Sequence, residues 1–257
     1  MSLAVAFLAA APARAVEVVR IAVALGPGPV TVTAPGLSAA PLREGTDASP
    51  VAGGRAVIAL EAGALSVNGA PADAAGVALT APGPLRLDAV SGAAFQGELE
   101  VRRTASGLAV VHALPLEDYV AAVTGAEMPA SFPPEALKAQ AVAARTFAVF
   151  KKLEAVGEGR PWHLGATVLD QVYRAGPPDA RARAAARATA GEVLVFQHAP
   201  IEAYFHSTCG GRTERGAEAL GRDRPYLVSV RCDRCRASPR ARWTLRVPAA
   251  ELGARAG

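Results

Sequence analysis

Short apolar segments broken by glycine and proline dominate the chain from Val16 to Ala113. Most are about four to eight residues long and rich in valine and leucine, a pattern that is typical of strands in a β-sandwich or barrel. The segments are VEVVRIAVAL, VTVTAPG, RAVIALEAG, LSVNG, VALTAPG, LRLDAV, FQGELEVRR and LAVVHAL. We therefore predict a β-rich N-terminal part over residues 16–113.

The pattern becomes helical from Leu116 onward. We predict helices over residues 116–127, 134–152 and 179–190, and the second begins with Pro134 and Glu135, which suit a helix N-terminus. Two strands are expected at 191–196 and 201–207, and the segment WTLRV at 243–247 opens like a further strand. A β-rich half followed by helices and further strands predicts the α+β class.

The composition is that of a folded chain, with 257 residues, 51% hydrophobic and 19% charged residues, and a net charge of +4. This length can bury the core of one large domain or two small ones. No stretch approaches the roughly 18 consecutive apolar residues of a membrane-spanning helix, so we expect no transmembrane segment in the mature chain. Three cysteines are too few for a scaffold built on disulfides.

The first fifteen residues, MSLAVAFLAAAPARA, combine a short apolar run with an A-x-A cleavage pattern. We predict a signal peptide over residues 1–15 and an exported protein, either periplasmic or associated with the cell wall. A buried first strand or a frayed terminus is the alternative.

Several motifs occur in a fixed order from residue 114 onward. Residues 114–150, LPLEDYVAAVTGAEMPASFPPEALKAQAVAARTFAVF, are followed by DQVYRAG at 170–176, T-x-G-E-V-L at 189–194, AYFHSTCGGRTE at 203–214 and PYLVSV at 225–230. In this order they resemble the stage II sporulation protein D (SpoIID/LytB) family. The resemblance implies a catalytic core over residues 114–257. Related domains continue past the W-T-L segment into further strands, so we expect this core to be truncated at its C-terminus.

The resemblance implies a peptidoglycan lytic transglycosylase, which cuts glycan strands, preferably those stripped of stem peptides. Other relatives are described as enhancers of a peptidoglycan amidase, and a non-enzymatic enhancer or a wall-binding module is therefore the alternative. The expected partners are peptidoglycan glycan strands and, for the alternative, a cell-wall amidase.

Glu127 is the candidate catalytic residue, because it follows Gly125 and precedes Met128 and Pro129 at the end of the first predicted helix. Cleaving a glycosidic bond needs a carboxylic acid that protonates the departing oxygen, and hydrolases add a second carboxylate. A lytic transglycosylase can manage with one, since the 6-hydroxyl of the sugar attacks C1 and gives a 1,6-anhydro product. A solvent-exposed Glu at a helix end is the alternative.

Six further polar residues are candidates for substrate binding. Lys138 and Arg145 lie seven residues apart, on one face of a helix, and would hold either Glu127 or a muramyl carboxylate, or else form a salt bridge within the fold. Side chains at positions that match the family could bind sugar hydroxyl or N-acetyl groups, or be buried polar groups of the core; these are Gln140, Gln171 and Tyr173. Ser207, in the AYFHST segment, is a further candidate from the resemblance.

Two pairs of residues with two-residue spacers, His206/Cys209 and Cys232/Cys235, use every cysteine of the chain. This spacing is typical of a tetrahedral zinc site, and four protein ligands would make it structural rather than catalytic. A Cys232–Cys235 disulfide is the alternative. Relatives that bind metal just before the Q-x-Y motif have no counterpart here, so His163 is expected to be an ordinary surface or core histidine.

The segment from Arg212 to Arg246 is basic, with ten arginines and four acids. No nucleic-acid-binding motif accompanies it, and we expect no nucleic-acid partner. Anionic wall polymers or muramyl carboxylates fit the charge, and a solvated arginine-rich face explains it equally well.

Overall fold

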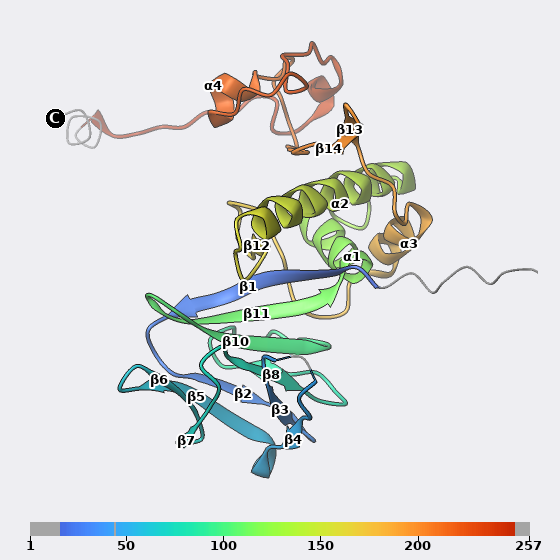
Figure 1. Cartoon of the computed structure of the whole chain (residues 1–257). Helices are drawn as coiled ribbons and strands as arrows, with labels where there is room; N and C mark the ends of the chain where they lie inside the picture. The colour runs from blue at the N-terminus through green and yellow to red at the C-terminus, as the bar shows by residue number, and fades with distance from the viewer. Residues whose placement is uncertain (1–15, 44, 250–257) are drawn as a thin grey trace, which may run out of the picture. The chain divides into compact units, whose positions relative to one another are not determined.

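The computed structural model describes residues 16–43 and 45–249. The chain divides into two compact units, the first ending at Ala203 and the second beginning at Tyr204 (Figure 1). The signal peptide predicted at residues 1–15 lies outside the described residues, and so does the end of the chain from residue 250. No helix in the described ranges is both long and apolar enough to cross a membrane.

A seven-stranded sheet crosses the middle of the first unit (Figure 1). Adjacent strands of this sheet run antiparallel, apart from the short parallel pair of β1 and β12. In sheet order the strands are β12 (Leu164–Gly165), β1 (Val18–Gly26), β11 (Gly107–Pro115), β10 (Glu98–Thr104), β8 (Val77–Thr80), β3 (Ser38–Pro41) and β4 (Ser49–Pro50).

A second, five-stranded sheet shares an apolar core with the first. In sheet order its strands are β7 (Ala70–Pro71), β6 (Ala64–Val67), β5 (Arg55–Glu61), β2 (Val30–Thr33) and β9 (Arg86–Leu87), with the short helix η1 (Ala52–Gly54) before β5. Ile58 and Leu87 of this sheet join Leu99 and Val110 of the larger one in the same buried cluster. Two sheets that enclose one core are the arrangement that the strand pattern predicts.

Three helices pack around a second core that β1 and β11 also line. They are α1 (Leu116–Glu127), α2 (Pro134–Gly157) and α3 (Ala180–Ala188). Helix α1 ends where Met128 turns extended, as the residue before a proline prefers. Helix α2 carries Pro134 in its first turn, and the Asp179 side chain caps α3 by accepting hydrogen bonds from two backbone N–H groups. The α+β class is confirmed.

The boundary predicted at residue 113 lies inside β11, whereas the two units separate between Ala203 and Tyr204. The strand expected at 191–196 shrinks to β13 (Val195–Phe196), which pairs with β14 (Ala199–Pro200). The prediction of a strand at 201–207 is wrong, because β14 ends before this segment and the segment itself is irregular. The prediction of a strand at 243–247 is wrong, and Trp243 is 81% exposed. An apolar run becomes a strand only where a neighbour accepts and donates its backbone hydrogen bonds, and residues 243–247 have no such neighbour within the described ranges.

The second unit has little regular structure. It contains the short helices α4 (Gly216–Leu220) and η2 (Arg234–Ala237). One isolated bridge joins Arg212 to Arg231. The bridge and a hydrogen bond of 2.9 Å from the Cys232 N–H to the Gly211 carbonyl oxygen join two of the cysteine-containing segments.

Candidate active site and cysteine cluster

Glu127 is the last residue of α1 and is partly buried. Its Oε1 atom accepts a hydrogen bond of 2.9 Å from the backbone N–H of Val172. The bond joins two motifs that lie 45 residues apart in the sequence. Since Oε2 has no hydrogen-bond partner within the described part of the chain, this oxygen remains available to exchange a proton.

The segment Asp170–Tyr173 is fixed by a hydrogen bond at every residue. Asp170 accepts from the backbone N–H of Gly165, at 2.7 Å. Gln171 accepts from the Tyr119 hydroxyl through Oε1, at 2.8 Å. Val172 donates to Glu127, and Tyr173 contacts His112. The position of the Glu127 carboxylate is therefore set by a segment that is itself held in place.

His112 is buried between two hydrogen-bond partners, and its tautomer follows from them. Nε2 lies 2.7 Å from the carbonyl oxygen of Gln96, which can only accept, so Nε2 carries the proton. Burial lowers the pKa of His112, and the neutral ring then accepts at Nδ1 from the Tyr173 hydroxyl, also at 2.7 Å. Burial also raises the pKa of Tyr173, with a contribution from Asp118. Tyr173 therefore remains a hydroxyl donor at neutral pH.

Tyr119 stacks on Tyr173, with ring centroids 5.7 Å apart. Burial raises the pKa of Tyr119 well above its ordinary value, and the nearby charges of Asp170 and Glu127 add to the effect. Its hydroxyl therefore stays protonated and orients the amide of Gln171, whose Nε2 is buried without a hydrogen-bond partner in the described residues. Gln171 is fully buried, so its role is to hold the segment next to Val172 rather than to contact a ligand.

Two clefts border Tyr173. One has a volume of about 330 Å³ and is lined by Phe95 and Arg174 among others. The other has a volume of about 340 Å³ and is lined by His112, Asp118 and Arg183 among others. Both are in the size range of small-ligand sites. Glu127 itself lines neither cleft; it is linked to them through the Val172–Tyr173 backbone.

Arg145 is fully buried and binds within the fold. Its Nε and Nη2 atoms donate to both carboxylate oxygens of Glu117, at 2.9 and 2.6 Å. The remaining N–H groups reach backbone carbonyls, including those of Ala186 and Glu192, and the Thr189 hydroxyl. Because the guanidinium is inaccessible and its donors are used, the prediction of Arg145 as a substrate contact is corrected. Arg145 ties α1, α2 and the end of α3 together.

The other predicted substrate residues are not brought together. Lys138 pairs with Glu135, one helical turn away, at 2.7 Å. Gln140 is partly buried, with an Nε2 atom that has no partner in the described residues. Ser207 lies exposed in the second unit. The sequence did not single out His112, Tyr119 or Glu117. Tyr119 and Glu117 lie in the segment that resembles the family, but their roles follow only from their long-range contacts in the fold.

The three cysteines of the second unit converge as free thiols, and together they could hold a metal ion. The Sγ atom of Cys235 lies 3.3 Å from that of Cys209 and 4.0 Å from that of Cys232. The backbone N–H of Cys209 also points to the Cys235 sulfur, at 3.3 Å. Thiolates bound at about 2.3 Å in a tetrahedral site would be separated by about 3.8 Å, so the spacing fits one ion.

His206 is not part of this metal-ligating group in the described chain, and its predicted role as the fourth ligand is corrected. Cys235 is the second residue of η2, and Cys232 lies just before its N-cap residue, Asp233. His206 and Cys209 lie outside any helical turn, and His206 is exposed. His163, in the first unit, is buried against β1 and accepts from the backbone N–H of Arg20 at 3.1 Å, as expected of a core histidine.

Comparison with known proteins identifies a family for the segment that contains Glu127 and the residues around it. Residues 104–196 match the family described as SpoIID, stage II sporulation protein. The chain is similar to stage II sporulation protein D of Bacillus subtilis (strain 168), with 36% identity over 57% of this chain and 47% of the relative. The Bacillus amyloliquefaciens protein of the same name is 39% identical over 54% of this chain and 45% of the relative.

An amidase enhancer of Bacillus subtilis (strain 168) is 35% identical over 49% of this chain and 16% of its own length. The chain thus spans about half the length of the sporulation relatives that it matches. The matched segment includes α1, α2, α3 and the residues from Asp170 to Tyr173. The resemblance of this chain to the stage II sporulation protein D family, first inferred from its motifs, is therefore confirmed.

Proposed function

We propose that the chain is a peptidoglycan lytic transglycosylase that cleaves glycan strands between N-acetylmuramic acid and N-acetylglucosamine, with Glu127 as its single acid and base. The supporting observation is the hydrogen bond from Val172 to Glu127. It fixes one carboxylate oxygen on a held segment and leaves the other free to transfer a proton.

The reaction follows from one carboxyl group. Protonated Glu127 gives its proton to the glycosidic oxygen as the bond from C1 to that oxygen breaks. The 6-hydroxyl of the muramyl residue forms the new bond to C1 and releases its proton to the Glu127 carboxylate. The products are a 1,6-anhydro end and a free 4-hydroxyl end, no water is consumed, and the enzyme returns to its protonated state.

Tyr173 and Gln171 are the proposed positioning residues for this reaction. Neutral His112 and a protonated Tyr173 keep the Asp170–Tyr173 segment in one hydrogen-bonded arrangement at neutral pH. The clefts beside Tyr173 are the candidate places for the sugar rings that flank the cleaved bond, since Glu127 itself lines neither cleft.

A non-enzymatic enhancer of a cell-wall amidase is the second candidate, favoured by the similarity to a protein named amidase enhancer. The two candidate functions are distinguished by incubating the purified chain with peptide-free glycan strands and identifying the products by mass spectrometry. Anhydro-ended fragments are expected from the transglycosylase. Intact strands, together with faster cleavage of peptide-bearing peptidoglycan by an added amidase, would replace the first proposal with the second.

We further propose that the cysteine cluster binds zinc in a structural role, through Cys209, Cys232 and Cys235. Three convergent thiols and an N–H group directed at one sulfur support it, because thiolates are preferred zinc ligands and gain from such hydrogen bonds. Zinc content measured on purified protein should fall in Cys232→Ser and stay unchanged in His206→Ala. Equal zinc in wild type and Cys232→Ser would contradict the assignment.

Export also remains a proposal, based on the apolar run and A-R-A pattern of residues 1–15. Mass analysis of the N-terminus of the protein produced in its own cell would show cleavage after Ala15.

A further inference from the structure

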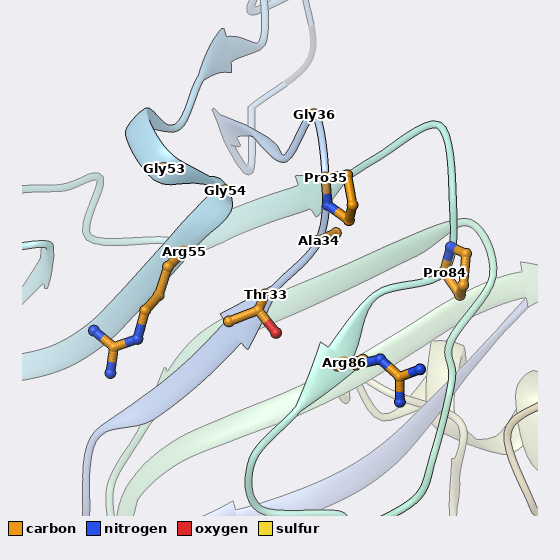
Figure 2. A pocket seen from close by; sticks show the side chains of 9 residues that line it. All are labelled: Thr33, Ala34, Pro35, Gly36, Gly53, Gly54, Arg55, Pro84 and Arg86. Carbon is orange, nitrogen blue, oxygen red and sulfur yellow. The ribbon is translucent and has the colours of Figure 1, made fainter.

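A hollow of about 500 Å³ opens on the five-stranded sheet, within the first unit and among residues that the active site does not use. Figure 2 shows Arg55 and Arg86 on opposite sides of Thr33, with Pro35 and Pro84 nearby. The prolines give the hollow a rigid apolar rim, because their rings fix the backbone.

The strand register explains why the two arginines share one face. Thr33 of β2 pairs directly with Arg55 of β5 on one side and with Arg86 of β9 on the other. Residues directly opposite each other across paired strands point to the same face. With about 4.8 Å between neighbouring strands, the two arginine backbones lie about 10 Å apart. The Thr33 hydroxyl group lies between them.

Neither arginine has a partner for its charge within the described residues. The other arginines of the β-rich part are engaged: Arg20 and Arg102 bind Glu100, Arg43 binds Asp73, and Arg103 donates to the carbonyl oxygen of Gly63. Near Arg86, the carboxylate of Asp88 accepts from the backbone N–H of Thr31. Both guanidinium groups are exposed, so their N–H groups are accessible to an anion.

We propose that Arg55, Thr33 and Arg86 form a binding site for an extended, hydroxyl-bearing polyanion, whose oxyanions bind the two guanidinium groups. Guanidinium forks match carboxylate and phosphate oxygens in two-point contacts, and the Thr33 hydroxyl can bind a hydroxyl of the same chain. The oxyanions can be the lactyl carboxylates of a peptide-free glycan or the phosphodiesters of a polyol phosphate polymer. The site does not depend on the chemistry of Glu127.

The test measures binding of two probes, peptide-free glycan strands and polyglycerol phosphate, to the full chain. All proteins carry Glu127→Gln, so that no probe is cut. Arg55→Ser, Arg86→Ser and the double variant are compared with the double control Arg43→Ser/Arg103→Ser, which loses the same charge from engaged arginines. Circular dichroism confirms that each variant is folded, as expected for exposed side chains.

Each single variant should weaken binding of the preferred probe roughly tenfold, and the double variant roughly 100-fold, while the control changes it less than about threefold. The affinity of Arg55→Lys/Arg86→Lys should lie between those of the wild-type residues and the double serine variant, because lysine keeps the charge but cannot make the two-point contact of a guanidinium group. The probe that responds identifies the source of the oxyanion. An equal loss in the double variant and the control, or no loss for either probe, overturns the proposal.

Discussion

Replacing Glu117 by Gln tests whether the contact with Arg145 holds the three helices together. Arg145 is fully buried, and Glu117 is the acid that accepts its two-point contact, although the Glu117 side chain is 38% exposed. The substitution keeps the shape but leaves the guanidinium buried without a carboxylate. Removing one partner of a buried ion pair costs about 3–5 kcal/mol.

We expect the free energy of unfolding to fall by about 3 kcal/mol, at the lower end of that range, because water reaches Glu117 and replaces part of the lost contact. For a chain of this size the melting temperature should fall by roughly 6–12 °C. Urea unfolding followed by the helical circular dichroism signal measures the change, since α1, α2 and α3 all lie in the first unit.

A double-mutant cycle with Arg145→Met sharpens the test. Once the arginine is gone, Glu117→Gln should cost less than about 0.5 kcal/mol, since the partly exposed carboxylate has no buried partner left. The reasoning is refuted by a Glu117→Gln protein within about 0.5 kcal/mol of wild type, or by equal effects of that substitution with and without Arg145.

Two further predictions concern stability. Burial, with the nearby charges of Lys152 and Arg20, lowers the pKa of His163 to about 4. As the pH falls, His163 is therefore protonated in the unfolded chain before it is protonated in the folded one. The free energy of unfolding should drop by up to about 3 kcal/mol between pH 6.5 and 4. His163→Asn should flatten that part of the pH profile of urea unfolding, and an unchanged slope would contradict the assignment. Gly107 has φ +131°, and a Cβ there would meet the backbone of residues 26 and 27, so Gly107→Ala should cost more than about 2 kcal/mol in the same assay. Gly92→Ala, at φ +75° in open space, should cost about 1–2 kcal/mol, and equal losses would show that the contact is unimportant.

The sequence predicts the local elements of this fold well where proline and glycine bound them. The helix predicted at 116–127 matches α1 to the residue, because Pro115 precedes it and Met128 stands before Pro129. The helix predicted to end at 152 continues to Gly157 instead, since nothing between Lys152 and Gly157 breaks the pattern.

Long-range contacts are what the sequence does not reveal. Glu117 and Arg145 lie 28 residues apart, and their spacing carries no sign that they meet. The same holds for His112 and Tyr173, which are 61 residues apart. The H-x-x-C and C-x-x-C pairs look alike in the sequence, but in the described residues the three cysteines form a group that could hold one ion and His206 does not join them. Apolar runs such as 243–247 likewise need a partner strand that no local pattern shows.

The most direct test of the account is the product made from peptide-free glycan strands by the wild-type chain and by Glu127→Gln. The substitution keeps an oxygen that can accept the Val172 N–H and removes the transferable proton. Wild type should release 1,6-anhydro-ended fragments, and Glu127→Gln should bind the strands with unchanged affinity and release at least about 100-fold fewer of these ends. Anhydro ends formed at the wild-type rate by Glu127→Gln would contradict the claim that one carboxyl group performs the reaction.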